Sequence, residues 1–285
     1  MIRLYNIDHF SLDETFLCGQ CFRWDKAEDG TFYGVVGSSA VKMYYHDPKT
    51  VYLESSNPDL VYWSRYLNFS NDYNAIESRL WQDEALRPCI ERGRGIRILR
   101  QELWETIVSF IISANNNIPR IKKIISKLCE LYGDKIEFDG KTFFGFPSPD
   151  VLAALELSDL KEIRAGFRDK YILDAAKRVA SGETDLSAIE KMNDRDAKAE
   201  LMKIRGVGSK VADCVLLFSL GRYKTFPQDV WIKRILNEVY GIDEKNISSF
   251  VAEKFGNYCG IAQQYLYYYY AVTKSDSNKL SLTEG

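Results

Sequence analysis

The spacing of apolar and polar residues changes once along the chain, near residue 58. Before that point, the segment TFYGVVGSSAVKMYYHDPKTVYLESS, residues 31–56, is rich in Val, Tyr and Phe and is interrupted by turn-forming residues. Short runs of this kind between turns are typical of strands, so we predict hairpins of an antiparallel sheet over residues 1–55. From Pro58 onward, apolar residues recur every three or four positions, which predicts helices.

From Leu99 the pattern predicts an almost entirely helical chain. The most apolar helix is ELWETIVSFIIS, residues 102–113, which we expect to be buried on most sides. Asparagines occupy positions 115–117, and their side chains compete with the backbone and favour helix ends. The next helix is amphipathic, with Pro119 in its first turn and Gly133 at its C-terminal stop. We predict a loop over residues 139–150, DGKTFFGFPSPD.

These patterns predict an α+β protein. An N-terminal antiparallel β-sheet domain with flanking helices, residues 1–98, would pack on a larger all-helical domain, residues 99–285. A chain of 285 residues with 46% hydrophobic composition is long enough for a substantial core.

The compartment is predicted from what the chain lacks. No apolar run approaches the roughly 20 residues that a membrane helix needs, and the chain opens without a signal-peptide pattern. Six cysteines in a chain this long do not form a disulfide framework, which favours a reducing compartment. We expect a cytoplasmic protein without a membrane partner, nucleoid-associated in a bacterium or nuclear in a eukaryote.

Charge indicates a partner only locally. The net charge of −2 does not by itself point to nucleic acid, but residues 203–234 carry seven basic side chains against two aspartates. A second basic run spans residues 87–100. Local patches of this kind create phosphate-binding surfaces, although they also occur as ordinary solvated helix faces.

The pair Cys18 and Cys21 forms a CxxC motif that suggests zinc or redox chemistry. No second CxxC follows, and His9 and His46 are the only histidines, so we expect no metal site. A redox role needs a strand-to-helix setting, whereas the surrounding CGQCFRW is typical of a strand or loop.

A glycine hairpin joins two short helical segments at Arg205-Gly206-Val207-Gly208. Glycines let the backbone turn sharply and approach a ligand, and Val207 would point inward. We predict that Ser209 caps a helix beginning at Lys210, whose exposed N–H groups suit an anion. The alternative is an ordinary helix–turn–helix in a bundle.

Lys210 and Asp229 add possible chemistry to the hairpin. An amine at a positive helix end, near other cations, loses its proton more easily and can then attack an electrophilic carbon to form a Schiff base. Asp229 precedes the segment WIKRIL, where its carboxylate can cap a helix or stabilise positive charge. The alternative roles are phosphate contact for Lys210 and capping alone for Asp229, and neither excludes the chemical role.

These residues carry a family resemblance. GVGSKVADC with the downstream Pro227–Asp229 segment resembles the helix–hairpin–helix glycosylase superfamily, and more closely its 8-oxoguanine DNA glycosylases. Four further segments resemble motifs of that family in the same order: GQCFRW at 19–24, NNNIPRI at 115–121, GFRDKY at 166–171 and YCGIAQQYLY at 258–267. The resemblance covers nearly the whole chain. It implies a base excision repair enzyme that flips and excises 8-oxoguanine opposite cytosine and nicks the abasic strand by β-elimination.

The resemblance implies roles for six residues at the chemical centre. Lys210 would be the Schiff-base nucleophile, and Asp229 would assist it and stabilise the sugar cation. The Gly19 carbonyl would accept the N7–H of 8-oxoguanine, a donor that guanine lacks. Cys214 and Tyr267 would sandwich the flipped base, and Gln263 would read its Watson–Crick edge.

The resemblance also implies contacts with double-stranded DNA, bound by a monomer without a cofactor. Asn115, Arg120 and Arg168 would fill the gap left in the duplex and contact the estranged cytosine. Phe167 would wedge between bases, a step that costs a few kcal/mol of unstacking. Gly206 and Gly208 would grip the backbone.

The chain departs from the family pattern at four positions. Arg205 stands where proline is usual, Gln228 and Trp231 where valine and histidine are common, and Tyr267 where phenylalanine is usual. After Asp229 the only cysteine is at position 259, which predicts no iron–sulfur cluster.

Two other functions fit parts of the pattern. A monofunctional alkyl-base glycosylase of the same superfamily would have no need for Lys210. A non-catalytic helix–hairpin–helix module would use Lys210 and Asp229 only as phosphate and cap residues.

Overall fold

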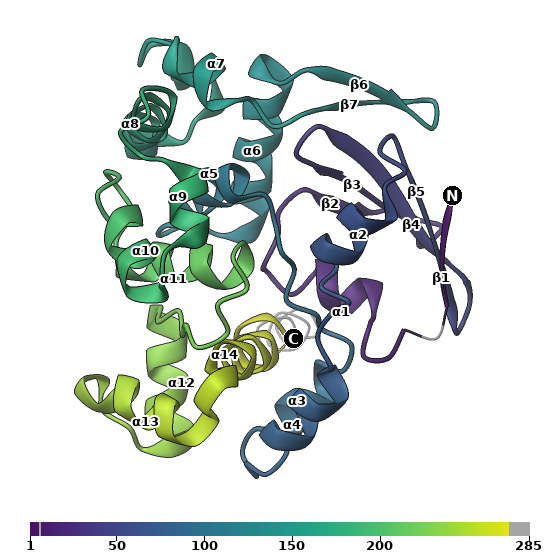
Figure 1. Cartoon of the computed structure of the whole chain (residues 1–285), viewed down its shortest axis with the longest axis vertical. Helices are drawn as coiled ribbons and strands as arrows, with labels where there is room; N and C mark the ends of the chain where they lie inside the picture. Colours follow the sequence, from purple (N-terminus) through teal and green to yellow (C-terminus); the bar gives the residue numbers. More distant parts are fainter. Residues whose placement is uncertain (6, 274–285) are drawn as a thin grey trace, which may run out of the picture.

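The N-terminal part of the chain forms a five-stranded antiparallel sheet with the order β1-β5-β4-β3-β2. The computed structural model describes residues 1–5 and 7–273 (Figure 1). The strands are β1 (Ile2–Tyr5), β2 (Trp24–Lys26), β3 (Phe32–Val36), β4 (Ser39–Asp47) and β5 (Thr50–Ser55). The predicted hairpins are confirmed. Strand β1 lies at one edge of the sheet, where it pairs with β5.

Helices make up most of the remainder. The α-helices are α1 (Leu12–Phe16), α2 (Leu60–Tyr66), α3 (Tyr73–Leu80), α4 (Arg87–Arg92), α5 (Leu103–Ser113), α6 (Ile118–Tyr132), α7 (Pro149–Ala153), α8 (Asp169–Ala180), α9 (Leu186–Lys191), α10 (Asp194–Leu201), α11 (Ser209–Phe218), α12 (Val230–Tyr240), α13 (Ile247–Phe255) and α14 (Cys259–Tyr267). Short 3-10 segments are η1 (Asp159–Ile163), η2 (Gly166–Arg168), η3 (Glu244–Asn246) and η4 (Gly256–Tyr258), and α14 continues into a π-helix, η5 (Tyr268–Thr273). Within the described residues, no helix has the length and hydropathy needed to cross a membrane.

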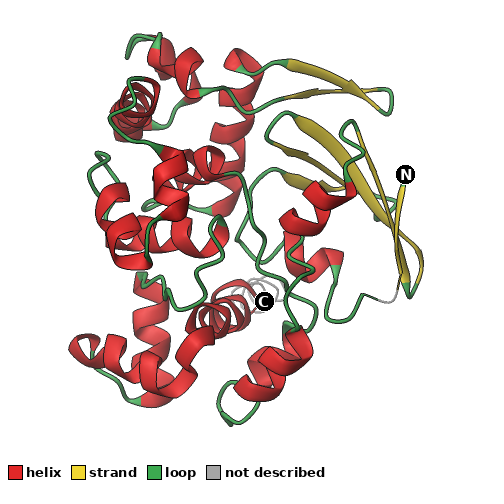
Figure 2. Ribbon diagram, in the orientation of Figure 1, coloured by secondary structure: helices red, strands yellow, loops and turns green. Residues whose placement is uncertain are grey.

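The sheet has its own apolar core, covered by α1 and α2 (Figure 2). Phe16 from α1 stacks on Trp24 with ring centroids 3.8 Å apart, and Trp63 from α2 is fully buried beside them. The prediction of strands throughout residues 1–55 was wrong for α1, because the short run after Ser11 is helical. Ser11 Oγ accepts the N–H of Glu14 at 3.4 Å and caps this helix.

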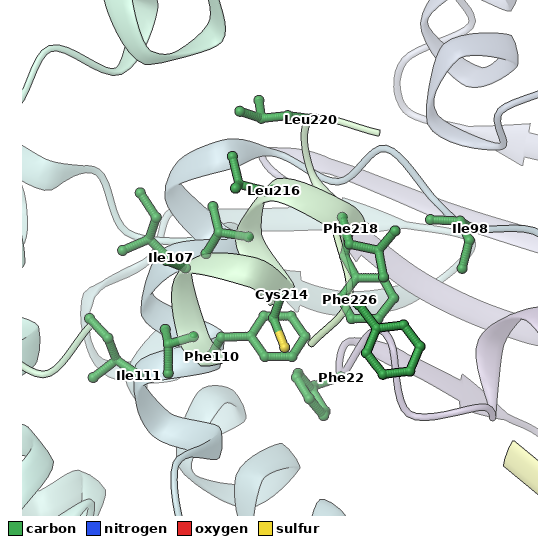
Figure 3. Close-up of a cluster of buried hydrophobic side chains, with 14 of the residues drawn as sticks. Phe22, Ile98, Ile107, Phe110, Ile111, Cys214, Leu216, Phe218, Leu220 and Phe226 are labelled. Carbon is green, nitrogen blue, oxygen red and sulfur yellow. The ribbon is translucent and has the colours of Figure 1, made fainter. Parts of the chain in front are cut away.

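The larger core is helical and centres on α5 and α11. Most of α5 is buried, as predicted, and Phe110 stacks on Phe218 of α11 at 5.5 Å (Figure 3). Helices α3 and α4 also contribute to this core, with Tyr73 and Ile90 among its buried members. Residues before position 99 therefore contribute side chains to both cores. The domain boundary between residues 98 and 99 stays a prediction.

The predicted ends of α6 are confirmed, because Pro119 lies in the first turn and the helix ends at Gly133. Asn117, which we had expected at the end of the preceding helix, caps α6 by accepting the N–H of Arg120 at 3.0 Å.

The loop predicted over residues 139–150 was wrong in its first half. Strands β6 (Lys135–Phe138) and β7 (Lys141–Phe144) form a hairpin whose turn residues, Asp139 and Gly140, both have positive φ, 52° and 68°. This geometry matches the twist of paired strands. The Asp139 carboxylate also accepts hydrogen bonds from Lys42 at 2.8 Å and Tyr33 at 3.0 Å, which attach the hairpin to the main sheet.

Candidate active site

Lys210 lies in the first turn of α11 and is half-buried. Its Nζ lies 5.4 Å from the ring centroid of Phe110, and Cys214 lies one turn further along the same helix. Burial raises the pKa of Cys214 to about 11, against the opposing effect of the lysine, so this thiol is neutral near physiological pH. Lys210 forms no ion pair with any residue that the structure describes, which leaves its amine available to a ligand.

Asp229 caps α12, as predicted. Its Oδ1 accepts the N–H of Ile232 at 2.8 Å. The same carboxylate contributes to the electrostatic environment of Tyr267, whose pKa is raised to about 12, first by burial and then by Asp229. After burial, the charges of Lys210 and Asp229 also affect the pKa of Cys214, the first lowering it and the second raising it. The nucleophile candidate, the carboxylate and the two base-binding candidates therefore belong to one cluster.

Gly19 completes this cluster from the N-terminal part of the chain. Its φ is +86°, and a Cβ at this position would lie 3.2 Å from Cε1 of Tyr267 and 3.5 Å from Cδ1 of Ile118. The positive φ and this tight contact with the tyrosine ring both favour glycine over a residue with a side chain. The prediction that segments more than 240 positions apart share one site depended on the family resemblance, and the structure brings them together.

Two glutamines that the sequence analysis did not single out fix the turn around Gly19. The buried Gln20 amide donates to the carbonyls of Thr15 at 2.8 Å and Arg97 at 2.7 Å. On the other side, Gln264 Nε2 donates to the carbonyl of Cys18 at 2.8 Å. Both glutamines lie inside segments that match family motifs, GQCFRW and YCGIAQQYLY, which was the signal that could have identified them.

Gln263 lies on α14 one turn before Tyr267. Its side chain is buried at 5% exposure, and its Oε1 has no hydrogen-bond partner among the described residues. A buried polar atom without a partner costs about 1–3 kcal/mol. An acceptor left unpaired beside Tyr267 fits a site that binds a polar ligand.

The hairpin has the predicted shape but a different cap. Gly206 has φ +88°, and Val207 is buried at 4% exposure, as expected for an inward-pointing residue. The prediction that Ser209 caps the helix was wrong, because Gly208 occupies the cap position and Ser209 is the first helical residue. Burial raises the pKa of Asp213, and the Ser209 side chain is among the groups that oppose this rise. Since no side chain caps α11, its first N–H groups are available for an anion.

Arg168 supports the loop after α5. This arginine is 2% exposed and donates to the carbonyls of Ala114 at 3.0 Å, Asn115 at 2.8 Å and Ala165 at 3.1 Å. Asn115 itself is exposed with φ +51°, a conformation that asparagine tolerates well. In this conformation the guanidinium holds the main chain, and its predicted contact with cytosine stays a prediction.

Phe167 is the exposed aromatic residue next to this clamp. Its ring is 53% exposed and lies 4.3 Å from the Arg168 guanidinium and 6.0 Å from the Tyr171 ring. Arg120, also exposed, donates a long hydrogen bond of 3.5 Å to the Arg164 carbonyl. Phe167, Arg120 and Asn115 thus form an exposed group with an apolar ring and polar side chains.

The CxxC motif does not read as a reactive pair. Cys18 and Cys21 are both buried, and burial raises the pKa of Cys18 to about 12 and that of Cys21 well above its ordinary value. Such thiols stay protonated and react slowly. No group of three or more His, Cys, Asp or Glu side chains suited to a metal occurs in residues 1–5 and 7–273.

A cleft of about 580 Å³ lies elsewhere, between β3, α6 and the β6–β7 hairpin. None of the predicted site residues lines it; Arg23, Lys122 and Lys141 do. Arg23 is paired with Glu105, and Lys122 is paired with Asp25.

Comparison with known proteins gives two family matches. Residues 2–107 match the N-terminal domain of 8-oxoguanine DNA glycosylases, and residues 108–259 match the HhH-GPD superfamily of base excision DNA repair proteins.

Individual proteins are similar over most of the chain. A probable N-glycosylase/DNA lyase of Methanothermobacter thermautotrophicus is 31% identical over 209 residues, 65% of this chain and 67% of that protein. The solved structure of MBOgg1 with a low-affinity DNA ligand is 43% identical, with a TM-score of 0.92 over 95% of this chain and 96% of that one. The 8-oxoguanine glycosylase/lyase of Clostridium acetobutylicum, solved with double-stranded DNA containing cytosine opposite 8-oxoguanine, is 41% identical, with a TM-score of 0.87 over 92% of each chain.

Proposed function

Since the chain belongs to the HhH-GPD superfamily and, within it, to the 8-oxoguanine DNA glycosylases, we propose that it removes 8-oxoguanine opposite cytosine through a Schiff base on Lys210. The protein is a bifunctional DNA N-glycosylase and abasic-site lyase of base excision repair. The observation that carries the mechanistic part is the cluster of Lys210, Cys214, Asp229, Tyr267 and Gly19.

Recognition of the base is proposed to use the space between Cys214 and Tyr267. The extruded purine would stack between the thiol and the ring, whose hydroxyl stays neutral because its pKa is about 12. The main-chain carbonyl of Gly19 would accept the N7–H that distinguishes 8-oxoguanine from guanine. Gln263, whose Oε1 lacks a partner among the described residues, would accept from the Watson–Crick edge.

In the proposed chemical step, the amine of Lys210 acts as the nucleophile. Its lone pair attacks C1′ of the deoxyribose, the glycosidic bond breaks, and the base leaves with the bonding electron pair and takes up a proton. The carboxylate of Asp229 stabilises the positive charge that develops on the sugar. Loss of an amine proton and opening of the sugar ring give the imine.

The imine then serves as the electron sink for strand cleavage. Loss of a proton from C2′ breaks the C3′–O bond, and the 3′ phosphate leaves with the electron pair. Because the imine formed on Lys210 accepts the electrons, the proposal requires neither a metal nor an organic cofactor.

The preference for cytosine opposite the lesion is proposed to depend on the exposed side chains of Phe167, Arg120 and Asn115. Phe167 would wedge into the duplex at the position of the extruded base, and Asn115 and Arg120 would contact the estranged cytosine. Arg168 would contribute either directly or through the loop carbonyls that it holds. The glycines of the hairpin and the first N–H groups of α11 would bind the backbone of the DNA.

Borohydride trapping tests the mechanism. The reductant converts the imine into a stable covalent adduct between protein and 8-oxoguanine duplex. We expect Lys210→Gln to bind this duplex without forming an adduct, whereas Lys203→Gln, on the exposed hairpin entry, should still trap. Robust trapping by the Lys210→Gln protein would overturn the proposed role of this lysine.

Substrate panels separate the proposal from its alternatives. Excision should be fastest opposite cytosine, and a preference for alkylated bases would favour the monofunctional alternative. Binding without turnover on any lesion would indicate a non-catalytic module. We further propose that the protein acts as a monomer in the compartment that holds DNA, the cytoplasm of a bacterium or the nucleus of a eukaryote.

A further inference from the structure

The entry to the hairpin is held by a hydrogen bond that proline could not make. The main-chain N–H of Arg205 donates to Oδ2 of Asp174 on α8 at 3.0 Å. The same carboxylate oxygen also accepts from Nε of Arg178 at 3.1 Å. Proline, the residue usual at this position in the resembling family, has no N–H to donate. The chain therefore replaces the rigidity of proline with a main-chain hydrogen bond to α8.

A second residue of α8 supports the same hairpin. Tyr171, three residues before Asp174, packs against Gly206 so closely that a Cβ there would lie 2.6 Å from its Cγ. Residues three apart on a helix share a face, so Tyr171 and Asp174 form one supporting surface. The ring of Tyr171 and the carboxylate of Asp174 therefore both hold the hairpin.

The side chain of Arg205 remains exposed. Its guanidinium carbon lies 6.0 Å from the Tyr171 ring centroid, and no ion pair joins it to any residue in the described part of the chain. Next to it, Val207 points inward, Gly206 and Gly208 have no side chains, and α11 begins without a side-chain cap. A cation here would add charge and several donors to a site otherwise built from main-chain N–H groups.

We propose that Arg205 has two functions in binding the DNA backbone. Its N–H, held by Asp174, fixes the hairpin in its binding conformation, and its guanidinium binds a backbone phosphate next to those bound by the hairpin N–H groups. Asp174 is then a positioning residue that acts through the hairpin. This inference rests on the proposed function for the identity of the ligand, a DNA duplex.

The guanidinium is tested by the salt dependence of binding. Dissociation constants for an undamaged duplex and an abasic-analogue duplex are measured over a series of salt concentrations. Arg205→Ala should reduce the slope of log affinity against log salt by about 1, the value for one lost phosphate contact in duplex DNA. Arg205→Lys should keep most of the slope, and Arg79→Ala, an exposed arginine on α3, should leave it unchanged.

An Arg205→Ala protein with an unaltered slope would overturn the phosphate contact. A wild-type protein that fails to bind either duplex would overturn the proposed function instead. The two failures are therefore distinguishable.

The positioning role is tested by a double-mutant cycle between Asp174→Asn and Arg205→Pro. Asp174→Asn alone should raise KM for the 8-oxoguanine duplex about tenfold or less, with kcat nearly unchanged, because the hairpin binds backbone and not the reacting atoms. In the Arg205→Pro background, Asp174→Asn should have little further effect on KM, because the N–H is already absent.

An equal effect of Asp174→Asn on KM in both backgrounds would overturn the positioning role. Arg178→Ala serves as the matched control, because it removes the other partner of Asp174 and leaves the hairpin N–H bound. If Arg178→Ala reproduces the whole effect of Asp174→Asn, the carboxylate stabilises α8 alone and the inference fails. Thermal unfolding of each variant reports whether the fold is intact.

Discussion

Gly19 and Tyr267 are in contact although 248 positions separate them in the chain: a methyl group added to Gly19 would lie 3.2 Å from the tyrosine ring. The contact places a main-chain turn directly against the ring proposed to stack on the extruded base. Substitution at either residue should therefore change the same site.

Gly19→Ala should lower the rate of 8-oxoguanine excision and destabilise the protein by about 1–3 kcal/mol, because an L-residue at φ +86° is strained. Binding to an abasic-analogue duplex, which offers no base, should be affected much less. Single-turnover excision and thermal unfolding provide the measurements. Gly145→Ala is the control, because a Cβ there meets only ordinary contacts of 3.6 Å or more. Unchanged excision by Gly19→Ala would contradict the proposed placement of the base.

The two hairpin glycines should respond differently to the same substitution. Gly206→Ala should destabilise the hairpin, because its φ is +88° and the new Cβ would lie 2.6 Å from Tyr171. A Cβ at Gly208 meets nothing within 4 Å, so Gly208→Ala should leave the melting temperature nearly unchanged. Gly208→Ala should nevertheless weaken DNA binding if a phosphate approaches this backbone closely. Equal loss of stability in the two variants would show that the supporting surface on α8 is unimportant.

Asp169→Asn should stabilise the protein near neutral pH. Burial raises the pKa of Asp169, and its Oδ1 has no hydrogen-bond partner among the described residues. A carboxyl group whose pKa is raised in the folded protein stabilises the fold while it is protonated. This stabilisation is complete below the ordinary pKa of 3.8, and it is lost as the pH rises through the pKa that the group has in the folded protein. The gain from Asp169→Asn, up to about 1 kcal/mol, should therefore shrink as the pH falls.

Chemical unfolding of the Asp169→Asn protein across a pH series measures this dependence. Asp185 offers the opposite case, since hydrogen bonds from Ser187 and Ala188 lower its pKa. The contribution of Asp185 to stability should be present near neutral pH and be lost on acidification. A stability difference for Asp169→Asn that does not vary with pH would rule out titration of Asp169 as its cause.

Trp231→Ala should weaken binding to lesion DNA by about tenfold, since stacking on an aromatic ring is worth about 1–3 kcal/mol per base. Trp231 is 51% exposed in the first turn of α12, next to Asp229 and the 81% exposed Val230. The buried face of this helix is made by Ile232, Ile235 and Leu236, so the fold does not require a large apolar residue at position 231.

Fluorescence quenching on titration with DNA measures the Trp231 contact directly. Trp231→Phe should keep most of the affinity but lose the quenching component of this indole. If Trp231→Ala binds as tightly as the wild-type protein, this exposed ring lies outside the DNA interface.

Elements with strong local signals were predictable. The ends of α6 followed from Pro119 and Gly133, and the cap of α12 followed from Asp229. The hairpin β6–β7 was missed although Asp139-Gly140 is a strong turn signal, because the flanking runs are only four residues long. The attachment of that hairpin through Lys42 and Tyr33 depends on tertiary contacts that local patterns do not contain.

The candidate site was predictable only as a set of residue types. Spacing suggested the hairpin, Lys210 and Asp229, but nothing local places Gly19 against Tyr267. The roles of Gln20 and Gln264 depend on hydrogen bonds to carbonyls far away in the sequence. Asp174 was overlooked because a carboxylate on an amphipathic helix looks like a solvated residue until the partner N–H is known.

The turn at Gly19 has an evolutionary consequence. In the proposed scheme a peptide oxygen discriminates the lesion, and no codon change at that position can delete a peptide oxygen. A change of preference toward another lesion would instead require a different orientation of this peptide plane. Replacement of Gln20 and Gln264, whose side-chain amides hold the turn, would change that orientation. Selection for altered damage preference should accumulate substitutions at these bracing positions before it reaches the glycine.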